Sequence, residues 1–531
     1  MSGIVVPSSV GMIRKHKPCE RGVSREAKKG GSSTGEAKMS DRHTNMKGRW
    51  LRLCCVLGLM LGGRGVVVAD DRPNLLFFFT EDQSPHMSFL GTEGLDTPNM
   101  DRIARQGVYF HRAFVQYPVC SPSKGNLFTG LSATTNGIRA NTINLFKPAE
   151  AVTASDRRHP LYDRLRIADQ YPTLIEILRE QGYYLGVTHK LHVLPNEKFP
   201  YHQWMRSPTK DDLKRFIREA QNRDQPFFLF YNIPQPHRPF PNSDQRSISV
   251  DPNEVSLPPL LPDDAVSRQD WAEYLANIEL ADRNIGLGLE ALEETGMTGK
   301  TVIFFAGDHG PAYHRGKMSL YDFGVRVPLA VAGPGICSGV ETNELISFLD
   351  LMPTILEMVG GPKPELAHGH SVLPFLRGQS ETTGRDYVFA EIQHNAQTRD
   401  DGMQERMVFD GRYRLIYREG RSKPRTVNDD LRSWQPWRNR VYSHIVENRE
   451  RYPDAYRLLA EIDNGRLEGA GELPRFELYD WSNDPWDLEN LAGDPQHREI
   501  FNRLRCVLHD WLIEIDDPHI TPAKIQEPAQ Y

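Results

Sequence analysis

The chain has 531 residues, of which 39% are hydrophobic and 25% are charged, and its formal net charge is −6. This length and composition are typical of a globular protein with a large core and two or more domains. The weak negative charge, with no basic tract beyond the N-terminal part, excludes the usual nucleic-acid-binding proteins, so we expect no nucleic-acid partner.

The first 69 residues differ from the rest. Residues 1–45 are polar and rich in Gly, Ser and Lys, so we expect a disordered extension or a start site assigned too far upstream. Residues 46–69 are typical of a signal peptide, because basic residues precede the apolar run Leu53–Leu61 and small residues precede Asp70. This run is shorter than the roughly 20 residues that span a bilayer, so we expect export without a stable membrane anchor. The alternative is an ordinary buried helix.

The cysteines and the lack of glycosylation sequences indicate the cellular compartment of the protein. Beyond residue 69 the chain keeps Cys120, Cys337 and Cys506, which make no disulfide framework. The sequence does not decide whether Cys337 and Cys506 form a bond. The chain has no Asn-x-Ser/Thr sequence, which an animal lysosomal enzyme usually carries. We therefore expect a bacterial protein exported to the periplasm or the medium rather than a lysosomal one.

Apolar runs short enough for buried strands alternate with amphipathic helices through residues 70–378. The expected strands are Leu75–Phe79, Tyr183–Val187, Pro226–Tyr231, Thr301–Ala306 and Val327–Ala332. The expected helices are Pro98–Gly107, Pro172–Gln181, Asp211–Asn222 and Arg268–Thr295. This alternation predicts an α/β fold with a large doubly wound, mixed or mostly parallel sheet flanked by helices.

Residues 379–531 follow another pattern. Short strands are expected at Tyr387–Glu391, Arg406–Phe409, Tyr413–Tyr417 and Phe476–Tyr479, followed by an amphipathic helix over Gln496–Ile513. We interpret this part as a smaller C-terminal α+β domain with an antiparallel sheet and a helix, and we leave 421–471 unassigned.

A cysteine stands where a loop enters a helix. Pro118 breaks an aromatic-rich loop, and the helix that begins near Cys120 is expected to end at Gly130. Free backbone N–H groups and the positive end of the helix dipole converge at such a position. They lower the pKa of a thiol and suit an anionic ligand.

Polar side chains follow several expected strands, where open α/β sheets place their ligand sites. Each cluster alone is equally consistent with a solvated turn. Together, the carboxylates suit a hard divalent cation such as Ca²⁺ or Mg²⁺, and the Lys and His side chains suit an oxyanion. The expected cation ligands are Glu81, Asp82, Asp308 and His309, and the expected anion donors are Lys190, His192, His237 and Lys317. Lys190 and His192 are expected to share one face of an extended segment.

The stretch from Cys120 to Gly130 resembles the sulfatase signature Cys-x-Pro-Ser-Arg-x-x-x-Leu-Thr-Gly, within the alkaline phosphatase superfamily. Other blocks resemble sulfatase blocks in sulfatase order, among them Pro236-His237-Arg238-Pro239-Phe240, Asp308-His309-Gly310 and Gly316-Lys317. The resemblance spans residues 72 to about 515. Thr129-Gly130-Leu131 and Asn136-Gly137 look most like the sulfamidase (heparan N-sulfatase) branch.

The resemblance implies a sulfohydrolase acting on a sulfated sugar, either an N-sulfoglucosamine or heparan-like glycan or another one. It implies that a maturation enzyme oxidises Cys120 to formylglycine, whose hydrate attacks sulfur beside one bound Ca²⁺ or Mg²⁺. It assigns Glu81, Asp82, Asp308 and His309 to the cation. Lys190 and Lys317 would hold sulfate oxygens, His237 would protonate the leaving group, and His192 would help to expel sulfate.

Three positions depart from the family pattern. Lys124 replaces a catalytic-site Arg, Glu81 replaces Asp, and His309 replaces the Asn common in the sulfamidase branch. Two other hypotheses stay open. One is a phosphodiesterase or phosphonate hydrolase of the same superfamily, and the other is a carbohydrate-binding relative whose Cys120 is not matured. The sequence also leaves open the linkage specificity and whether the chain forms a homodimer.

Overall fold

Strand β1 (Asn74–Thr80) is the centre of the large sheet, and all of its residues are buried. It pairs in parallel with β5 (Phe227–Ile233) on one side and with β6 (Thr301–Gly307) on the other. Its side chains alternate between two cores: Phe77 and Phe79 enter one, and Leu76 and Phe78 enter the other. A strand that is apolar on both faces belongs in a sheet covered on both faces, as the sequence predicts.

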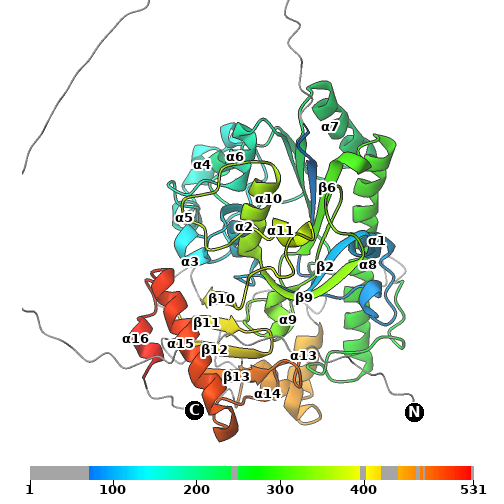
Figure 1. Ribbon diagram of the computed structural model, residues 1–531. Helices are drawn as coiled ribbons and strands as arrows, with labels where there is room; N and C mark the ends of the chain where they lie inside the picture. The colour runs from blue at the N-terminus through cyan, green and yellow to red at the C-terminus, as the bar shows by residue number, and fades with distance from the viewer. Residues whose placement is uncertain are drawn as a thin grey trace, which may run out of the picture. The chain divides into compact units, whose positions relative to one another are not determined.

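The computed structural model describes residues 71–240, 249–394, 402–419, 440–461, 467–469 and 473–527 (Figure 1). Residues Asp70–Tyr531 form one compact unit. The predicted extension and signal peptide, residues 1–69, lie outside the described residues, as does most of the unassigned segment 421–471. The division of the chain near residue 378 stays a prediction.

The large sheet has nine strands in the order β4-β3-β5-β1-β6-β8-β2-β7, and β9 pairs with β2. The pairs from β4 through β6 are parallel, whereas β8 runs antiparallel to both β6 and β2. This confirms the predicted mixed, mostly parallel sheet. The remaining strands are β2 (Gly107–Phe114), β3 (Tyr184–Thr188), β4 (Gln203–Met205), β7 (Arg326–Val327), β8 (Leu329–Ala332) and β9 (Val340–Ser347).

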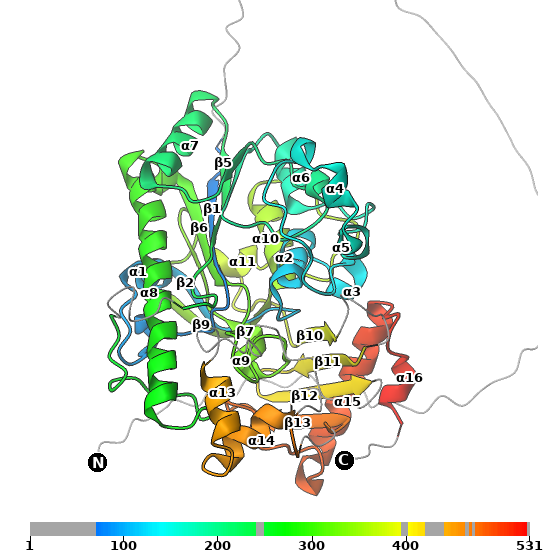
Figure 2. The ribbon, with the colours of Figure 1, turned by 180° about the vertical axis from the view of Figure 1, so that it is seen from behind.

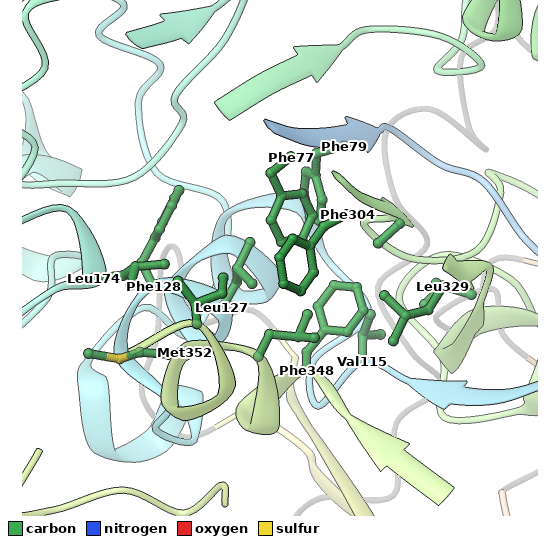
Figure 3. Close-up of a cluster of buried hydrophobic side chains, with 14 of the residues drawn as sticks. Phe77, Phe79, Val115, Leu127, Phe128, Leu174, Phe304, Leu329, Phe348 and Met352 are labelled. Atoms are coloured by element: carbon green, nitrogen blue, oxygen red, sulfur yellow. The ribbon is translucent and has the colours of Figure 1, made fainter. Parts of the chain in front are cut away.

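Helices cover both faces of this sheet (Figures 1 and 2). One face carries α1 (Pro98–Gln106), α7 (Lys210–Asn222) and the long α8 (Ala265–Glu294). The other carries α2 (Cys120–Thr129), α6 (Leu174–Glu180) and α10 (Leu351–Met358), whose side chains surround Phe77, Phe79 and Phe304 (Figure 3). Shorter helices are α3 (Ala133–Asn136), α4 (Ala154–Arg157), α5 (Pro160–Arg164), α9 (Asp322–Val325) and α11 (Leu373–Leu376).

The sequence analysis missed three strands, β2, β4 and β9, and joined two others. Gly107 ends α1 as predicted, but it also begins β2, where an added Cβ would lie 2.1 Å from the Val331 carbonyl oxygen. The predicted strand Val327–Ala332 is interrupted at Pro328, because proline has no N–H to donate to a neighbouring strand. Strand β9 has a polar, half-exposed first half, so it lacks the continuous apolar run by which the other strands were recognised.

The second sheet is antiparallel, in the order β10-β11-β12-β13, and α15 (Arg498–Glu514) packs against it (Figure 2). Its strands are β10 (Val388–Gln393), β11 (Gln404–Phe409), β12 (Tyr413–Glu419) and β13 (Phe476–Asp480). This confirms the predicted C-terminal sheet and helix. Helices α13 (Arg440–Glu447) and α14 (Pro453–Glu461) instead join the core beside α8, and α16 (Pro522–Ile525) packs near the end of the chain.

Two smaller expectations also have an outcome. Cys337 and Cys506 are not joined by a disulfide in the structure. Within the described part of the chain, none of the helices is both long and apolar enough to cross a membrane.

A buried charge network ties the small sheet to the large one. Arg414 of β12 lies 2.8 Å from an Asp322 carboxylate oxygen at the start of α9 and also pairs with Asp487. Asp487 in turn accepts a hydrogen bond of 2.7 Å from the Asp322 backbone N–H. None of the three side chains has more than a few per cent of its surface exposed, so their charges depend on one another for compensation.

Replacing Arg414 with Met should therefore lower the free energy of unfolding by about 3–5 kcal/mol, because the buried Asp487 side chain loses its cation and Asp322 keeps only Arg326. Arg412, two residues earlier, pairs with Asp480 but has 53% of its side chain exposed. Arg412→Met should cost less than about 1 kcal/mol. Denaturant unfolding of both variants tests this, and equal losses would contradict the account.

Candidate active site

The ends of β1 and β6 bring four of the predicted side chains together. Because these strands are parallel neighbours in register, Glu81 and Asp82 leave the sheet beside Asp308 and His309. The Asp82 backbone N–H donates to Asp308 Oδ1 at 2.7 Å, and the Asp308 N–H donates to the Thr80 carbonyl at 2.9 Å. Asp82 has a positive φ of 59°, which turns the chain sharply just beyond the strand.

Cys120 is the first residue of α2, which ends at Gly130 in the left-handed conformation, as the sequence predicts. Its side chain is buried, and its Sγ lies 3.3 Å from His309 Nε2. Burial opposes ionisation of this thiol, but the charges of Lys190, Lys317 and His309 outweigh burial and hold the pKa of Cys120 well below its ordinary value. Residue 120 therefore lies in a pocket of positive potential.

Each oxygen of the Glu81 carboxylate contacts one lysine. Lys124 Nζ lies 2.6 Å from Glu81 Oε1, and Lys190 Nζ contacts Glu81 Oε2. Lys124 is wholly buried, lies over the Phe79 ring and is 3.6 Å from Asp308 Oδ2. Burial would disfavour the Glu81 carboxylate, but the two lysines outweigh it and hold the pKa of Glu81 far below its ordinary value.

His237 and Lys317 meet on another side of the site. Lys317 Nζ lies 3.2 Å from His237 Nε2 and 3.0 Å from Asp82 Oδ1. As predicted, the proline-rich segment that carries His237 is not helical. His237 keeps 27% of its side chain exposed, so it can reach a ligand that enters from solvent.

Lys190 and His192 both reach Cys120, but not through the predicted extended segment. His189 and His192 each have a φ of 55°, in the left-handed region, so the chain turns twice after β3. His192 Nε2 donates a hydrogen bond of 2.7 Å to the Thr142 carbonyl, which leaves the buried Nδ1 as the ring nitrogen available to residue 120. The expectation of an extended segment was wrong. His189 and His192 adopt the left-handed conformation, so side chains in this segment do not alternate between two faces as they do along a strand.

The residues at the strand ends fit a divalent cation. Ligand atoms of Asp82, Asp308, His309 and Cys120 lie within 4.8 Å of one another. Asp308 Oδ2 is buried and accepts no hydrogen bond, and burial raises the pKa of Asp308 to about 7. Burial also opposes protonation of His309, yet Asp308 and Asp82 raise its pKa to about 9. A cation would give the Asp308 Oδ2 atom the partner that it lacks among the described residues.

Glu81 stands apart from the other expected cation ligands. It groups with Cys120 and His237 rather than with Asp82, Asp308 and His309, and both of its oxygens contact lysines. The sequence analysis also overlooked Asn232 and Ser123. Asn232 Nδ2 donates to Glu81 Oε1 at 3.2 Å, and Ser123 Oγ donates to the Asp308 carbonyl at 2.7 Å. Asn232 lies within the last residues of β5, so the strand-end rule could have found it.

Sequence comparisons identify the family of the chain. A family model described as Sulfatase matches residues 73–212 and 205–361. A second model, described as N-sulphoglucosamine sulphohydrolase, C-terminal, matches residues 307–423. An ulvan-active sulfatase of Formosa agariphila is 28% identical over 506 residues, covering 84% of this chain and 76% of that protein. The N-sulphoglucosamine sulphohydrolase of Homo sapiens is 26% identical, covering 88% of this chain and 94% of that protein.

Solved structures share the fold. A 2-O GAG sulfatase superposes with a TM-score of 0.59 at 20% identity, covering 87% of this chain and 97% of that one. A phosphonate monoester hydrolase of Silicibacter pomeroyi superposes with a TM-score of 0.59 at 18% identity, covering 85% of this chain and 97% of that one. At these identities the superpositions establish the fold alone.

The buried contact between Glu81 and Lys124 predicts a coupled pair. Lys124→Arg should destabilise the protein by about 1–3 kcal/mol, because the larger guanidinium enters a filled space. Glu81→Asp should also destabilise it, because the shorter arm no longer reaches Lys124. The double variant, with a long cation and a short anion, should lose less than the sum of the two.

Denaturant unfolding of the two single variants and the double variant measures this coupling. Lys210→Arg is the control, because Lys210 pairs with Glu290 in a more exposed setting, and it should change stability by less than about 0.5 kcal/mol. Additive losses at Glu81 and Lys124 would show that the two residues are not matched in length.

Proposed function

Since the chain belongs to the sulfatase family and is a hydrolase of sulfuric esters, we propose that it removes sulfate from a sulfated sugar, with a formylglycine at position 120 and a divalent cation. The observation that carries this proposal is the surroundings of Cys120. Three candidate cation ligands lie on one side of it, and Lys190 and Lys317 contribute positive charge. This arrangement suits a tetrahedral oxyanion whose charge grows during attack.

The proposed substrate class is an N-sulfoglucosamine-type or other glycosaminoglycan-like sugar. The match of residues 307–423 to the model of N-sulphoglucosamine sulphohydrolases and the human relative of that name support it. One solved neighbour, at a TM-score of 0.58, was crystallised with the substrate D-glucosamine-2-N,6-O-disulfate. The ulvan-active relatives favour the wider class of sulfated glycans over a single linkage.

In the proposed mechanism, a formylglycine hydrate at position 120 would supply the nucleophile, and a bound divalent cation would supply Lewis-acid stabilisation of the sulfate. Asp82, Asp308 and His309 would hold the cation, whereas Glu81, the fourth expected ligand, lies apart from them with both oxygens on lysines. Lys190 and Lys317 donate hydrogen bonds to the remaining sulfate oxygens. His237 would give a proton from Nε2 to the leaving oxygen or nitrogen; in the structure this nitrogen lies 3.2 Å from Lys317 Nζ, which can only donate, so Nε2 would first take its proton from Lys317 or solvent. His192 beside residue 120 takes the proton that must leave that residue for sulfate to be expelled.

Lys124 would act indirectly, through Glu81 and Asp308. Its ammonium group compensates both buried carboxylates and thereby keeps the floor of the site rigid. We also propose that a formylglycine-generating enzyme acts on the Cys120 motif and that the chain is exported, as the segment 46–69 predicts. The catalytic part would comprise residues 70–378, and residues 379–531 would form the smaller domain.

The main alternative is a phosphorus substrate, because the phosphonate hydrolase fold is similar. Release of sulfate and of phosphate on a panel of N-sulfated and O-sulfated glucosamines, other sulfated glycans, phosphodiesters and phosphonates tests the choice. We expect sulfate release from at least one sugar and a loss of about 10³-fold or more in Cys120→Ala. Release of phosphate alone, or sulfate release unaffected by Cys120→Ala, would overturn the proposal.

Binding of a cation should raise the melting temperature of the chelator-treated protein, since the ion binds only the folded chain. Addition of Ca²⁺ should therefore raise the melting temperature of the unsubstituted protein but not that of Asp308→Ala. Asp282→Asn serves as a control, because Asp282 is also buried but caps α1 through the Met100 N–H, and it should keep the full response. An undiminished Ca²⁺ response in Asp308→Ala would place the cation elsewhere.

A further inference from the structure

Asp270 of α8 is a buried carboxylate that contacts two segments of the active site at once. Its side chain is 1% exposed. It accepts hydrogen bonds from Arg238 Nη1 at 3.1 Å and Nη2 at 2.5 Å, and from the Tyr313 hydroxyl at 2.7 Å. Arg238 directly follows His237, and Tyr313 belongs to the loop that leads to Lys317.

The two segments come from different strands, and Asp270 contacts both of them. The His237 segment follows β5, whereas the Lys317 segment follows β6. Beyond Asp270, Arg238 joins them through its Nε–H, which donates to the Ala312 carbonyl at 3.4 Å, and through its position over the Tyr313 ring at 4.8 Å. Where the segments meet, His237 Nε2 lies 3.2 Å from Lys317 Nζ.

The charged groups around Asp270 hold the His237 segment and the Lys317 segment rigidly where they meet. The forked contact with Arg238 fixes both the position and the orientation of the guanidinium. The other face of the guanidinium lies 4.1 Å from the Phe240 ring centre, so Arg238 is enclosed by aromatic rings. Arg440 of α13 adds a second cation, 3.7 Å from Asp270 Oδ1.

We propose that Asp270 is a positioning residue that holds His237 and Lys317 at the separation needed for proton delivery to the leaving group. This rests on the role of His237 proposed above. In the described part of the chain the Asp270 carboxylate is bonded to Arg238 and Tyr313 rather than to residue 120, so it would act on the site through these two side chains. Loss of its charge leaves Arg238 buried beside a neutral amide, which frees the His237 segment from the Lys317 segment.

Leaving-group dependence separates this role from a loss of folded protein. Nitrophenyl sulfate leaves as a stable phenolate and needs little protonation, whereas a sugar oxygen or nitrogen needs a well-placed proton donor. Asp270→Asn should lower kcat by about 10²-fold on a sulfated sugar that the unsubstituted enzyme hydrolyses. It should lower kcat on nitrophenyl sulfate by severalfold at most, with little change in KM. Tyr313→Phe, which removes one hydrogen bond to Asp270, should lower kcat on the sulfated sugar by less than Asp270→Asn does.

Asp282→Asn is the matched control, because Asp282 lies on the same helix, is 2% exposed and, within the described part of the chain, accepts its hydrogen bonds from the start of α1. It should leave the ratio of the two kcat values unchanged whatever it costs in stability. Equal losses of kcat on both substrates in Asp270→Asn would overturn the proposal.

A crystal structure of Asp270→Asn gives a readout that does not depend on activity. We expect the separation of His237 Nε2 from Lys317 Nζ to exceed 3.2 Å there. If the separation is unchanged, Asp270 is not the positioning residue, even if the protein proves to be a sulfatase. If the separation grows but His237→Ala shows no preference between the two substrates, the proton-donor role of His237 fails, and the positioning role in proton delivery fails with it.

Discussion

The parallel pairing of β1 with β6 is the constraint on which the site depends. It places the residue after Thr80 beside the residue after Gly307, so the pairs Glu81-Asp82 and Asp308-His309 leave the sheet at the same point. The backbone contact from Asp82 to Asp308 fixes their relative position at 2.7 Å. The apolar core on both faces of β1 holds this arrangement, because a shift of register would bury the wrong side chains.

Three carboxylates and one imidazole lie in a buried space. The negative charge of the carboxylates requires compensation, and other elements of the structure supply it. Lys124 comes from α2, Lys190 from the turns after β3, and Lys317 from the loop after β6. Glu81 is held between two of these lysines, which accounts for its long arm and for the Lys at position 124. The two departures from the sulfatase pattern keep both charges and change only the side-chain lengths, and the contact between Lys124 and Glu81 links the helix of Cys120 to the end of β1.

Much of the fold and most of the site could be predicted from the sequence, because they rest on continuous apolar runs and on polar residues that directly follow them. Strands β1, β5 and β6 and helix α8 are of this kind. Strands β2 and β9 were missed because polar residues interrupt their apolar pattern, and β4 was missed because it has only three residues. Asp270 could not be found, since on sequence alone it is one more acidic residue of a helix. Its meaning comes from Arg238 and Tyr313, which only tertiary structure brings to it.

The central claim is that Cys120 becomes the nucleophile of a sulfatase at the end of this sheet. Its surroundings fit that role: a buried helix start, three nearby cationic groups and a cluster of cation ligands. The most direct test is the mass of the tryptic peptide that contains residue 120, from protein made in its natural host. The account predicts an aldehyde in place of the thiol in most of the protein. An unmodified thiol in all of it would contradict the account.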